Sequence, residues 1–367
     1  MSFLTHFNNL EDGRTDINIA HNLLDVVFLT VVAVISGAEG WLDIQRFGDA
    51  KLTWLRRHRP FEAGIPRRHT VARIISALEP DRLLACFLDW VNEAREKQGQ
   101  EHIAIDGKTL RRSHDGEQRR ALHLLSAMVV DSGLVIAQRP CDGKANELTT
   151  VSGLLDLLNI EGSCVSLDAM HCQTQTVAKL RQKKADYVIQ VKANQKGLYQ
   201  EIQAYFHKVR RDNPDEAARG VYHDVDKGHG RLEQRRYTRL DVSDWLENRK
   251  AWSDLASLVE VVRTVESGGQ MREETSYYIS SLGAGTPALA DKIRRHWQIE
   301  NGQHWILDVV FREDDSRVRT GDGPCNMALF RRFALNLAKC SPSKDSMKGK
   351  LKRAAWDDEF RSKLLFG

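Results

Sequence analysis

The sequence predicts an α/β protein: a mixed five-stranded sheet with helices, preceded by an all-helical N-terminal domain and interrupted by a β-rich insertion. Three observations predict it. Residues 1–95 carry apolar side chains at helical spacing, and residues 98–195 alternate short apolar runs with helical stretches. The stretch at about 196–285 has longer strand-like runs around a glycine turn. We therefore expect a helical domain over 1–95 and a second domain over 98–367 that contains the insertion.

The composition permits a sizeable core and a nucleic-acid partner without demanding one. Of 367 residues, 41% are hydrophobic, and the formal net charge is +4. The six cysteines show no Cys-x-x-Cys spacing and no signal peptide is recognised, so we expect reduced thiols, no zinc site and a cytoplasmic protein. The longest apolar run, Leu23–Ile35, contains Asp25 and is too short to span a membrane, so it indicates a buried helix.

In the N-terminal domain, helices are expected over 21–36 and 41–47, from Pro66, and from Pro80. The third of these begins with basic residues, Arg67 and Arg68. Recognition helices contact DNA with their N-terminal residues, so this helix is a candidate DNA reader. The alternative is a surface helix with a solvated basic end, and the sequence leaves both open.

The second domain begins with strands and helices in the order β-β-β-α-β-α-β. Strands are expected over 102–106, 122–130, 134–138, 164–168 and 187–191, with helices over 148–158 and 174–183. The first strand ends in Asp106 and the fourth in Asp168. A buried strand rarely carries an unpaired carboxylate, so a bound cation would explain both acids; the alternative for each is an acid that caps a turn. This order is the ribonuclease-H-like arrangement, in which the two strands are neighbours.

The insertion is expected to open with a helix over 198–209 and to continue as strand-like runs. These runs cover 235–240, 258–265 and 274–280, and Ser267-Gly268-Gly269 forms a hairpin turn.

The segment from Ile293 to Asp315 reads as helical. Ile293, Trp297 and Glu300 are spaced to share one side of a helix, which would let Glu300 face a site at the sheet edge. We interpret Trp297 and Trp305 as core residues rather than base-stacking ones. Rivals for a third carboxylate follow nearby in the chain: Asp308, Glu313, Asp314 and Asp315.

Two aspartates on adjacent strands and a glutamate on a packing helix suit magnesium, which prefers oxygen ligands and leaves room for phosphate oxygens. Two such ions could activate the attacking water or hydroxyl and stabilise the leaving oxygen of a phosphodiester.

These motifs resemble a known family, the DDE transposases of bacterial insertion sequences, in the group that includes the H-repeat-associated proteins of Rhs elements. The resemblance covers nearly the whole chain and is most specific at His296-Trp297-Gln298-Ile299-Glu300-Asn301. The other matching segments are 23–41, 64–66, 105–108, 144–147, 167–170, 191–195 and 229–233. By this resemblance, the catalytic and metal-binding triad is Asp106, Asp168 and Glu300.

The chain departs from many relatives outside this group, which place Tyr and Arg before the glutamate and Lys after it. Here these positions hold Ile293, His296 and Leu307, and Ala145 replaces a usual Ser. All three carboxylates are present, so we expect an intact site. Other residues would then help to grip DNA, and an exposed basic loop is the alternative for Lys108, Arg111 and Arg112. The candidate DNA contacts are Lys108, Arg111, Arg112, Lys192, Asn194, Arg294, Arg295, His296 and His304.

The resemblance implies a transposase that binds its element's ends and, with Mg²⁺ or Mn²⁺ (two ions), cleaves DNA and transfers the strand. It also implies DNA partners, namely terminal inverted repeats and target DNA, and a homodimer or larger assembly, without membrane association. The sequence leaves two alternatives: a stand-alone nuclease of the same fold, and an inactive remnant that only binds DNA.

Overall fold

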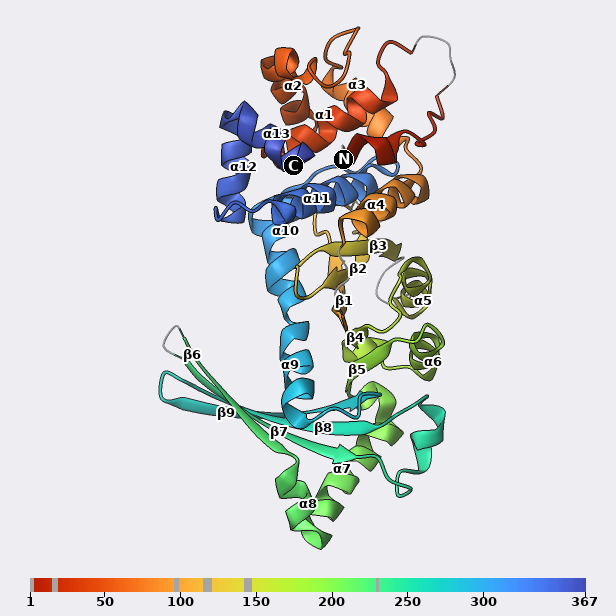
Figure 1. The fold of residues 1–367 in the computed structure, drawn as a ribbon, viewed down its shortest axis with the longest axis vertical. Coiled ribbons are helices and arrows are strands. Elements are labelled where there is room, and N and C mark those ends of the chain that lie inside the picture. The colour runs from red at the N-terminus through yellow and green to blue at the C-terminus, as the bar shows by residue number, and fades with distance from the viewer. Residues whose placement is uncertain (1–2, 15–18, 96–98, 115–120, 142–146, 229–230) are drawn as a thin grey trace.

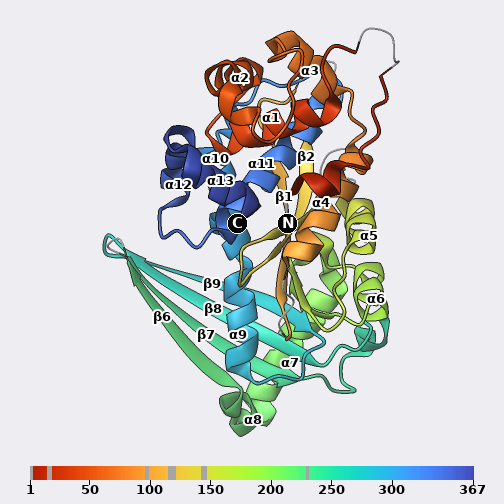
Figure 2. The same cartoon turned by 45° about the horizontal axis from the view of Figure 1, so that its top comes forward.

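The computed structural model describes residues 3–14, 19–95, 99–114, 121–141, 147–228 and 231–367. Its elements form an elongated molecule with helices at one end, a sheet in the middle and a twisted arm of long strands at the other end (Figures 1 and 2). Both chain ends lie at the helical end (Figure 1). Two motifs noted in the sequence, at 144–146 and 229–230, lie outside the described residues.

The helical end is built from both ends of the chain. Its N-terminal elements are η1 (Phe3–Phe7), α1 (Leu23–Ile35), α2 (Trp41–Leu55), α3 (Arg68–Ser76) and α4 (Pro80–Ala94). Its C-terminal elements are α11 (Gly323–Cys340), α12 (Met347–Trp356) and α13 (Asp358–Phe366). The predicted apolar helix is confirmed as α1, which packs along α11, and α2 continues well past the predicted end. No described helix has both the length and the apolar character needed to cross a membrane.

A buried acid in α1 has a structural role. The Asp25 carboxylate accepts hydrogen bonds from Arg59 Nε and from the backbone N–H of Phe61, both at 2.9 Å. These bonds satisfy the carboxylate inside an otherwise apolar helix and tie down the loop after α2, where Phe61 has φ of 47°. Asp25 therefore fixes the position of the loop that follows α2.

The central sheet has nine strands in the order β3-β2-β1-β4-β5-β9-β8-β7-β6. All five strands predicted for the core form, and the two that precede the aspartates are neighbours. The sheet continues beyond β5, because β9 pairs with β5 in an antiparallel orientation. The strands are β1 (His102–Thr109), β2 (His123–Val129), β3 (Val135–Cys141), β4 (Cys164–Leu167), β5 (Asp186–Val191), β6 (Val221–Gly228), β7 (Arg231–Asp241), β8 (Ser257–Ser267) and β9 (Gln270–Ser280).

The insertion therefore extends the core sheet, and it has four strands where three were predicted. The missed strand is β6, which is exposed or half-buried along its whole length. Strand β6 lies at the edge of the arm and pairs only with β7, so neither of its faces is buried. Its sequence therefore shows no alternation of apolar and polar residues from which a strand could be predicted. The hairpin turn at Gly268 and Gly269 is confirmed, and both glycines have positive φ.

Helices cover the two faces of the core sheet. Helices α5 (Glu147–Leu157) and α6 (Thr174–Gln182) lie on one face, and α9 (Thr286–His296) runs along the other (Figure 1). Under the arm lie α7 (Lys196–Asp212) and α8 (Pro214–Arg219) (Figure 1). The remaining short turns are η3 (Ala169–His171), η4 (Ala193–Gln195), η5 (Glu247–Ala251) and η7 (Glu313–Asp315).

The predicted helical segment 293–315 is not one continuous helix. After α9 the chain turns at Trp297, passes through a π-helical turn at Glu300–His304 and continues as α10 (Trp305–Val309). Lys339 of α11 donates to the Gly302 carbonyl at 2.8 Å and so braces this turn from the helical end. Such π turns are frequent at functional sites.

Candidate active site

The strand register brings two aspartates together. Strands β1 and β4 are parallel, and Ile105 of β1 lies opposite Leu167 of β4. The residues that follow these two, Asp106 and Asp168, therefore lie at the same height along the sheet. Both side chains are partly exposed, at 22% and 42%. Asp168 Oδ1 accepts a hydrogen bond of 3.1 Å from the backbone N–H of Met170, which caps η3. The capping alternative is therefore real for Asp168, but its second oxygen is not used by this bond.

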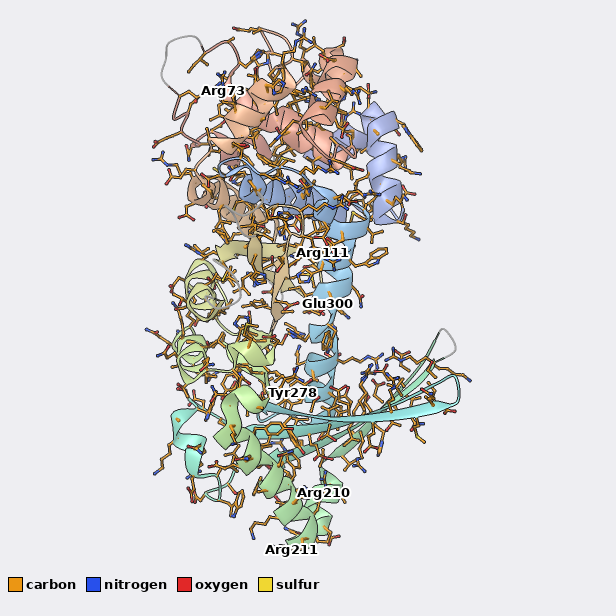
Figure 3. All side chains as sticks on the ribbon, turned by 180° about the vertical axis from the view of Figure 1, so that it is seen from behind. Arg73, Arg111, Arg210, Arg211, Tyr278 and Glu300 are labelled. Atoms are coloured by element: carbon orange, nitrogen blue, oxygen red, sulfur yellow. The ribbon has the colours of Figure 1, made fainter. Side chains whose placement is uncertain are left out.

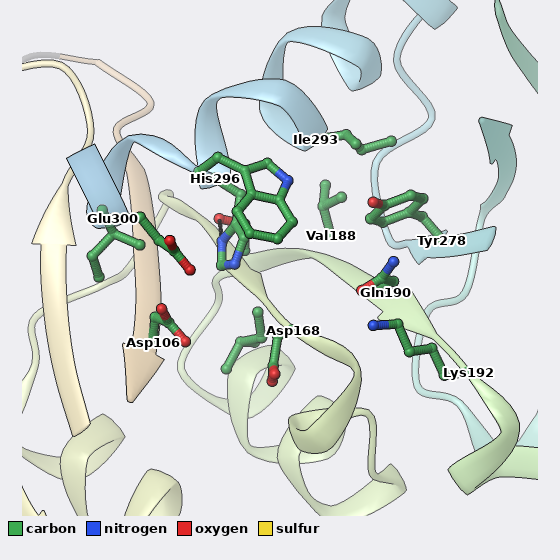
Figure 4. Close-up of a pocket in the computed structure, with 13 residues that line it drawn as sticks. Asp106, Asp168, Val188, Gln190, Lys192, Tyr278, Ile293, His296 and Glu300 are labelled. Carbon is green, nitrogen blue, oxygen red and sulfur yellow. Dashed lines mark hydrogen bonds between the residues drawn. The ribbon is translucent and has the colours of Figure 1, made fainter. Parts of the chain in front are cut away.

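Glu300 approaches the two aspartates from the π turn. Asp106, Asp168 and Glu300 line one pocket of about 110 Å³, together with residues of β4, β5, β9 and α9. Figure 4 shows the Asp106 and Glu300 carboxylates facing each other across its mouth. Glu300 is exposed at the first residue of the turn, so its carboxylate can reach the pocket without crossing the core.

The four rival acids have basic partners. Asp308 and Asp314 lie 2.6 and 3.0 Å from Lys108 Nζ. Asp315 pairs with Arg112 and Arg312, and buried Glu313 pairs with Arg332. None of these four acids lines the pocket, whereas Glu300 does. The geometry therefore favours Glu300 as the third carboxylate.

The donor set suits a divalent metal ion. The pocket offers three carboxylates, and hard oxygen ligands are those that Mg²⁺ and Mn²⁺ accept. Among the described residues, no three His, Cys, Asp or Glu side chains stand close enough together to form a finished metal site. The three acids therefore fit the ion by their chemistry and line one pocket, but they are not yet close enough together to form a complete ligand set, and Asp168 also caps η3.

The basic residues after the first aspartate are engaged with acids. Strand β1 extends to Thr109, beyond the predicted end, so Lys108 lies within the strand and is buried between Asp308 and Asp314. Arg111 and Arg112 are exposed and also pair with the acidic segment, at 3.3 and 3.1 Å. Lys108 therefore anchors the Glu300-bearing segment to β1.

Lys192 and Asn194 follow β5, beside the pocket. Lys192 is exposed and lines the pocket wall, where a cation can meet a phosphate. Asn194 donates to the Ala169 carbonyl at 2.7 Å and so connects the loop after β5 to the loop that carries Asp168.

The candidates on and after α9 are held by nearby groups. Arg294 pairs with Asp224 and Asp226 of β6, and Arg295 pairs with Asp131 of the β2–β3 turn. His304 Nδ1 lies 3.6 Å from Asp106 Oδ2, and burial lowers the His304 pKa to about 3. His304 is thus neutral beside a candidate metal ligand.

His296 lines the pocket and points into the space between Asp106 and Asp168 (Figure 4). Its Nδ1 lies 2.8 Å from Ser166 Oγ. Burial lowers its pKa to about 4, so His296 is neutral at physiological pH.

The core assignment of the two tryptophans is wrong. Trp297 and Trp305 are 55% and 56% exposed. The turn at Trp297 rotates the helical segment, and its buried side then continues through Ile299, Gln303 and Leu307. The predicted common side of Ile293, Trp297 and Glu300 is confirmed, since all three line the pocket.

Sequence reasoning missed several pocket residues. Gln190 of β5 and Tyr278 of β9 are register partners, so the insertion itself supplies part of the wall. Ser166 of β4 lies two residues before Asp168. Because side chains alternate along a strand, this spacing places both on the same face, and Ser166 could have been predicted as a pocket residue from it. No local pattern could have found Tyr278, because its position depends on which strand pairs with β5.

Comparisons with known proteins identify the family of this chain. The Transposase DDE domain family matches residues 97–337, and the DDE_Tnp_1-associated family matches residues 4–91. The chain belongs to the DDE transposase family. This DDE transposase is 36% identical to the H repeat-associated putative transposase YhhI of Escherichia coli K12, over 99% of its length and 97% of the relative.

Other relatives and one solved structure are similar. The putative transposase YncI of Escherichia coli O157:H7 is 35% identical, with 99% of this chain and 94% of the relative covered. A piggyBac transposase synaptic complex with hairpin DNA aligns with 100% of this chain and 79% of its own at TM-score 0.41 and 11% identity, a likeness too distant to carry a conclusion.

Proposed function

We propose that this transposase binds the ends of its own element, cuts the phosphodiester backbone with water and joins the freed 3′-hydroxyl to target DNA. The observation that carries the proposal is the pocket in which Asp106, Asp168 and Glu300 meet from two adjacent strands and a π turn. The order β3-β2-β1-β4-β5, with Asp106 within β1 and Asp168 directly after β4, supports a ribonuclease-H-like core that the arm strands extend.

The three carboxylates would hold Mg²⁺ or Mn²⁺, with two ions as the expected number. When bound, these ions supply a Lewis acid and an activated water for phosphodiester cleavage. Asp106 and Asp168 are placed to share an ion because they lie at one level on parallel strands. Lys192 stands at the pocket wall to meet a DNA phosphate, and Asn194 holds the Asp168 loop in place.

Cleavage of supercoiled plasmids tests this function. Wild-type protein with Mg²⁺ or Mn²⁺ should cut and join only plasmid that carries the element ends, and EDTA or Asp168→Asn should stop it. Cutting of plasmid without ends would instead identify a nuclease. End binding without any cutting in the wild type would identify a DNA-binding remnant and overturn the catalytic proposal.

We also propose that the helical domain over residues 1–95 contacts DNA through α3. Arg67, Arg68 and Arg73 are exposed, and no carboxylate of the described residues lies within ion-pair distance of them. Arg211, by contrast, is an exposed arginine that lies 2.6 Å from the carboxylate of Asp212. Figure 3 shows Arg73 at the helical end and Arg211 at the opposite end of the molecule.

Replacing Arg67, Arg68 and Arg73 with alanine should weaken DNA binding and reduce its salt dependence. Each lost phosphate contact should lower the slope of log affinity against log salt by about 1. Fluorescence anisotropy over a salt series measures this, with Arg211→Ala as the matched control. An unchanged slope in the triple variant would show that α3 presents only a solvated basic end.

Two element ends must be brought together for transposition, so we propose that the active form on DNA is a homodimer or larger. Sedimentation of the protein with and without end DNA tests this, and a single copy bound to each end at all concentrations would contradict it.

A further inference from the structure

Three side chains form a hydrogen-bonded row behind the pocket. His102 Nε2 and His296 Nδ1 each lie 2.8 Å from the same hydroxyl, Ser166 Oγ. His102 and Ser166 are almost fully buried, on β1 and β4, and His296 ends α9. Because side chains alternate along a strand, His102 shares a sheet face with Asp106, and Ser166 shares it with Asp168.

The shared hydroxyl couples the tautomers of the two histidines. A serine hydroxyl has one proton and two lone pairs, and the two rings are the only hydrogen-bond partners of Ser166 Oγ among the described residues. If Ser166 accepted from both rings, its own buried proton would have no acceptor, so it donates to one ring nitrogen and accepts from the other. Burial lowers the His102 pKa to about 2 and the His296 pKa to about 4, so each ring is neutral and carries one N–H. Only two arrangements remain, and they place the His296 proton on opposite nitrogens.

The ring nitrogen of His102 that does not face Ser166, Nδ1, distinguishes the two arrangements. His102 Nδ1 is buried and has no hydrogen-bond partner. A buried N–H without an acceptor is rarer and costlier than a buried acceptor without a donor. The His102 proton therefore belongs on Nε2, where it donates to Ser166. The Ser166 hydroxyl then donates to His296 Nδ1, which leaves the His296 proton on Nε2.

We propose that His102 and Ser166 are positioning residues that hold His296 as the neutral Nε2–H tautomer, which donates a hydrogen bond to a backbone phosphate oxygen of DNA in the pocket. The proposal rests on the proposed function, since it needs DNA beside Asp106 and Asp168. His296 lines the pocket, and this tautomer makes it a hydrogen-bond donor there. With its lone-pair nitrogen occupied by Ser166, His296 is neither a metal ligand nor a fixed charge.

Nuclear magnetic resonance of the full chain with ¹⁵N-labelled histidine tests the tautomer without any metal or DNA. Long-range ¹H–¹⁵N spectra, with His296 assigned by loss of its signals in His296→Gln, should show the Nε2–H pattern. Ser166→Ala should convert His296 to a mixture of tautomers while its thermal unfolding midpoint shows that it is folded. A Nδ1–H pattern in the wild type would overturn the proposal and make Nε2 available to a metal ion.

The role toward DNA is tested by two substitutions at His296. A glutamine amide places its NH₂ near the position of the histidine Nε2, whereas an asparagine amide places it near Nδ1. His296→Gln should keep end cleavage within about 10-fold, and His296→Asn should lose roughly 10–100-fold in kcat/KM. Equal losses in both variants would overturn the donor role.

A neutral backbone probe separates this inference from the proposed function. Binding of end DNA with a methylphosphonate at the cleavage position, measured without metal, should be weaker than binding of normal DNA, and by a larger factor for the wild type than for His296→Asn. An equal penalty in both proteins would refute the phosphate contact. Failure of the wild type to cleave any DNA would refute the proposed function and leave the tautomer result intact.

Discussion

Glu300→Gln should abolish DNA cleavage while the protein stays folded and still binds DNA. Glutamine keeps the size of the side chain but removes the charge that, in the proposed function, helps to hold a divalent cation beside Asp106 and Asp168, with which Glu300 lines the pocket. Loss of a supporting hydrogen bond around a metal site costs roughly 10–100-fold. Loss of a ligand should exceed that range, and the rate of plasmid cleavage at saturating Mg²⁺ measures it.

The matched control is Asp315→Asn on the same segment. Asp315 pairs with Arg312 at 2.6 Å and with Arg112 at 3.1 Å, is partly exposed and does not line the pocket. Surface pairs of this kind contribute little, so cleavage should change by no more than about 2-fold. Cleavage retained within 10-fold in Glu300→Gln would show that another acid completes the site.

Glu313→Gln should lower the free energy of unfolding by about 3–5 kcal/mol. Glu313 Oε1 and Arg332 Nη1 lie 2.8 Å apart, and both side chains are completely buried. Removing the acid leaves an uncompensated guanidinium in the core, because the other contact of Nη1 is only the Ala328 carbonyl at 3.0 Å. Urea unfolding followed by tryptophan fluorescence measures the change.

Two further variants make this prediction specific. Glu359→Gln removes an exposed helix pair with Lys363 and should cost no more than about 0.5 kcal/mol. Replacing both buried partners, as Glu313→Leu with Arg332→Met, should recover much of the lost stability, since no unpaired charge remains. A double variant as unstable as Glu313→Gln would mean that packing at this site, rather than the unpaired charge, sets the cost.

The buried pair also bears on the active site. Glu313 begins η7, directly after the segment that carries Glu300 and α10, and Arg332 belongs to α11. Together with Lys108 and its two aspartates, the pair fixes this segment at its far end. Loosening it should therefore reduce cleavage in Glu313→Gln at temperatures where the protein is still folded.

Sequence reasoning succeeded where the signal is local. Asp106 and Asp168 each follow a short apolar run, and such a run is sufficient to predict a buried strand that ends in an acid. The helical character of α1 and α9 followed from apolar spacing in the same way. Glu300 was placed near them by its helical spacing from Ile293 and Trp297 and by the family resemblance of the segment around it.

The failures have a common cause in long-range contacts. Lys108 was expected to follow the first strand as a DNA contact, with an exposed basic loop as the alternative, but β1 continues through it and its buried amino group pairs with Asp308 and Asp314. Strand β6 is exposed and has no apolar alternation, so only its pairing with β7 makes it a strand. The tryptophans were assigned to the core because a straight helix was assumed, and the turn at Trp297 changes which side is buried.

The sequence by itself determined which segments are strands or helices with apolar faces, and which acids stand at their ends, because these depend on periodicities of two to four residues. The tertiary structure decided which elements became neighbours. The register of β1 on β4, the pairing of β9 with β5 and the Ser166 hydroxyl between two histidines all join residues far apart in the chain. Such contacts arise from the packing of whole elements, and no local pattern specifies them.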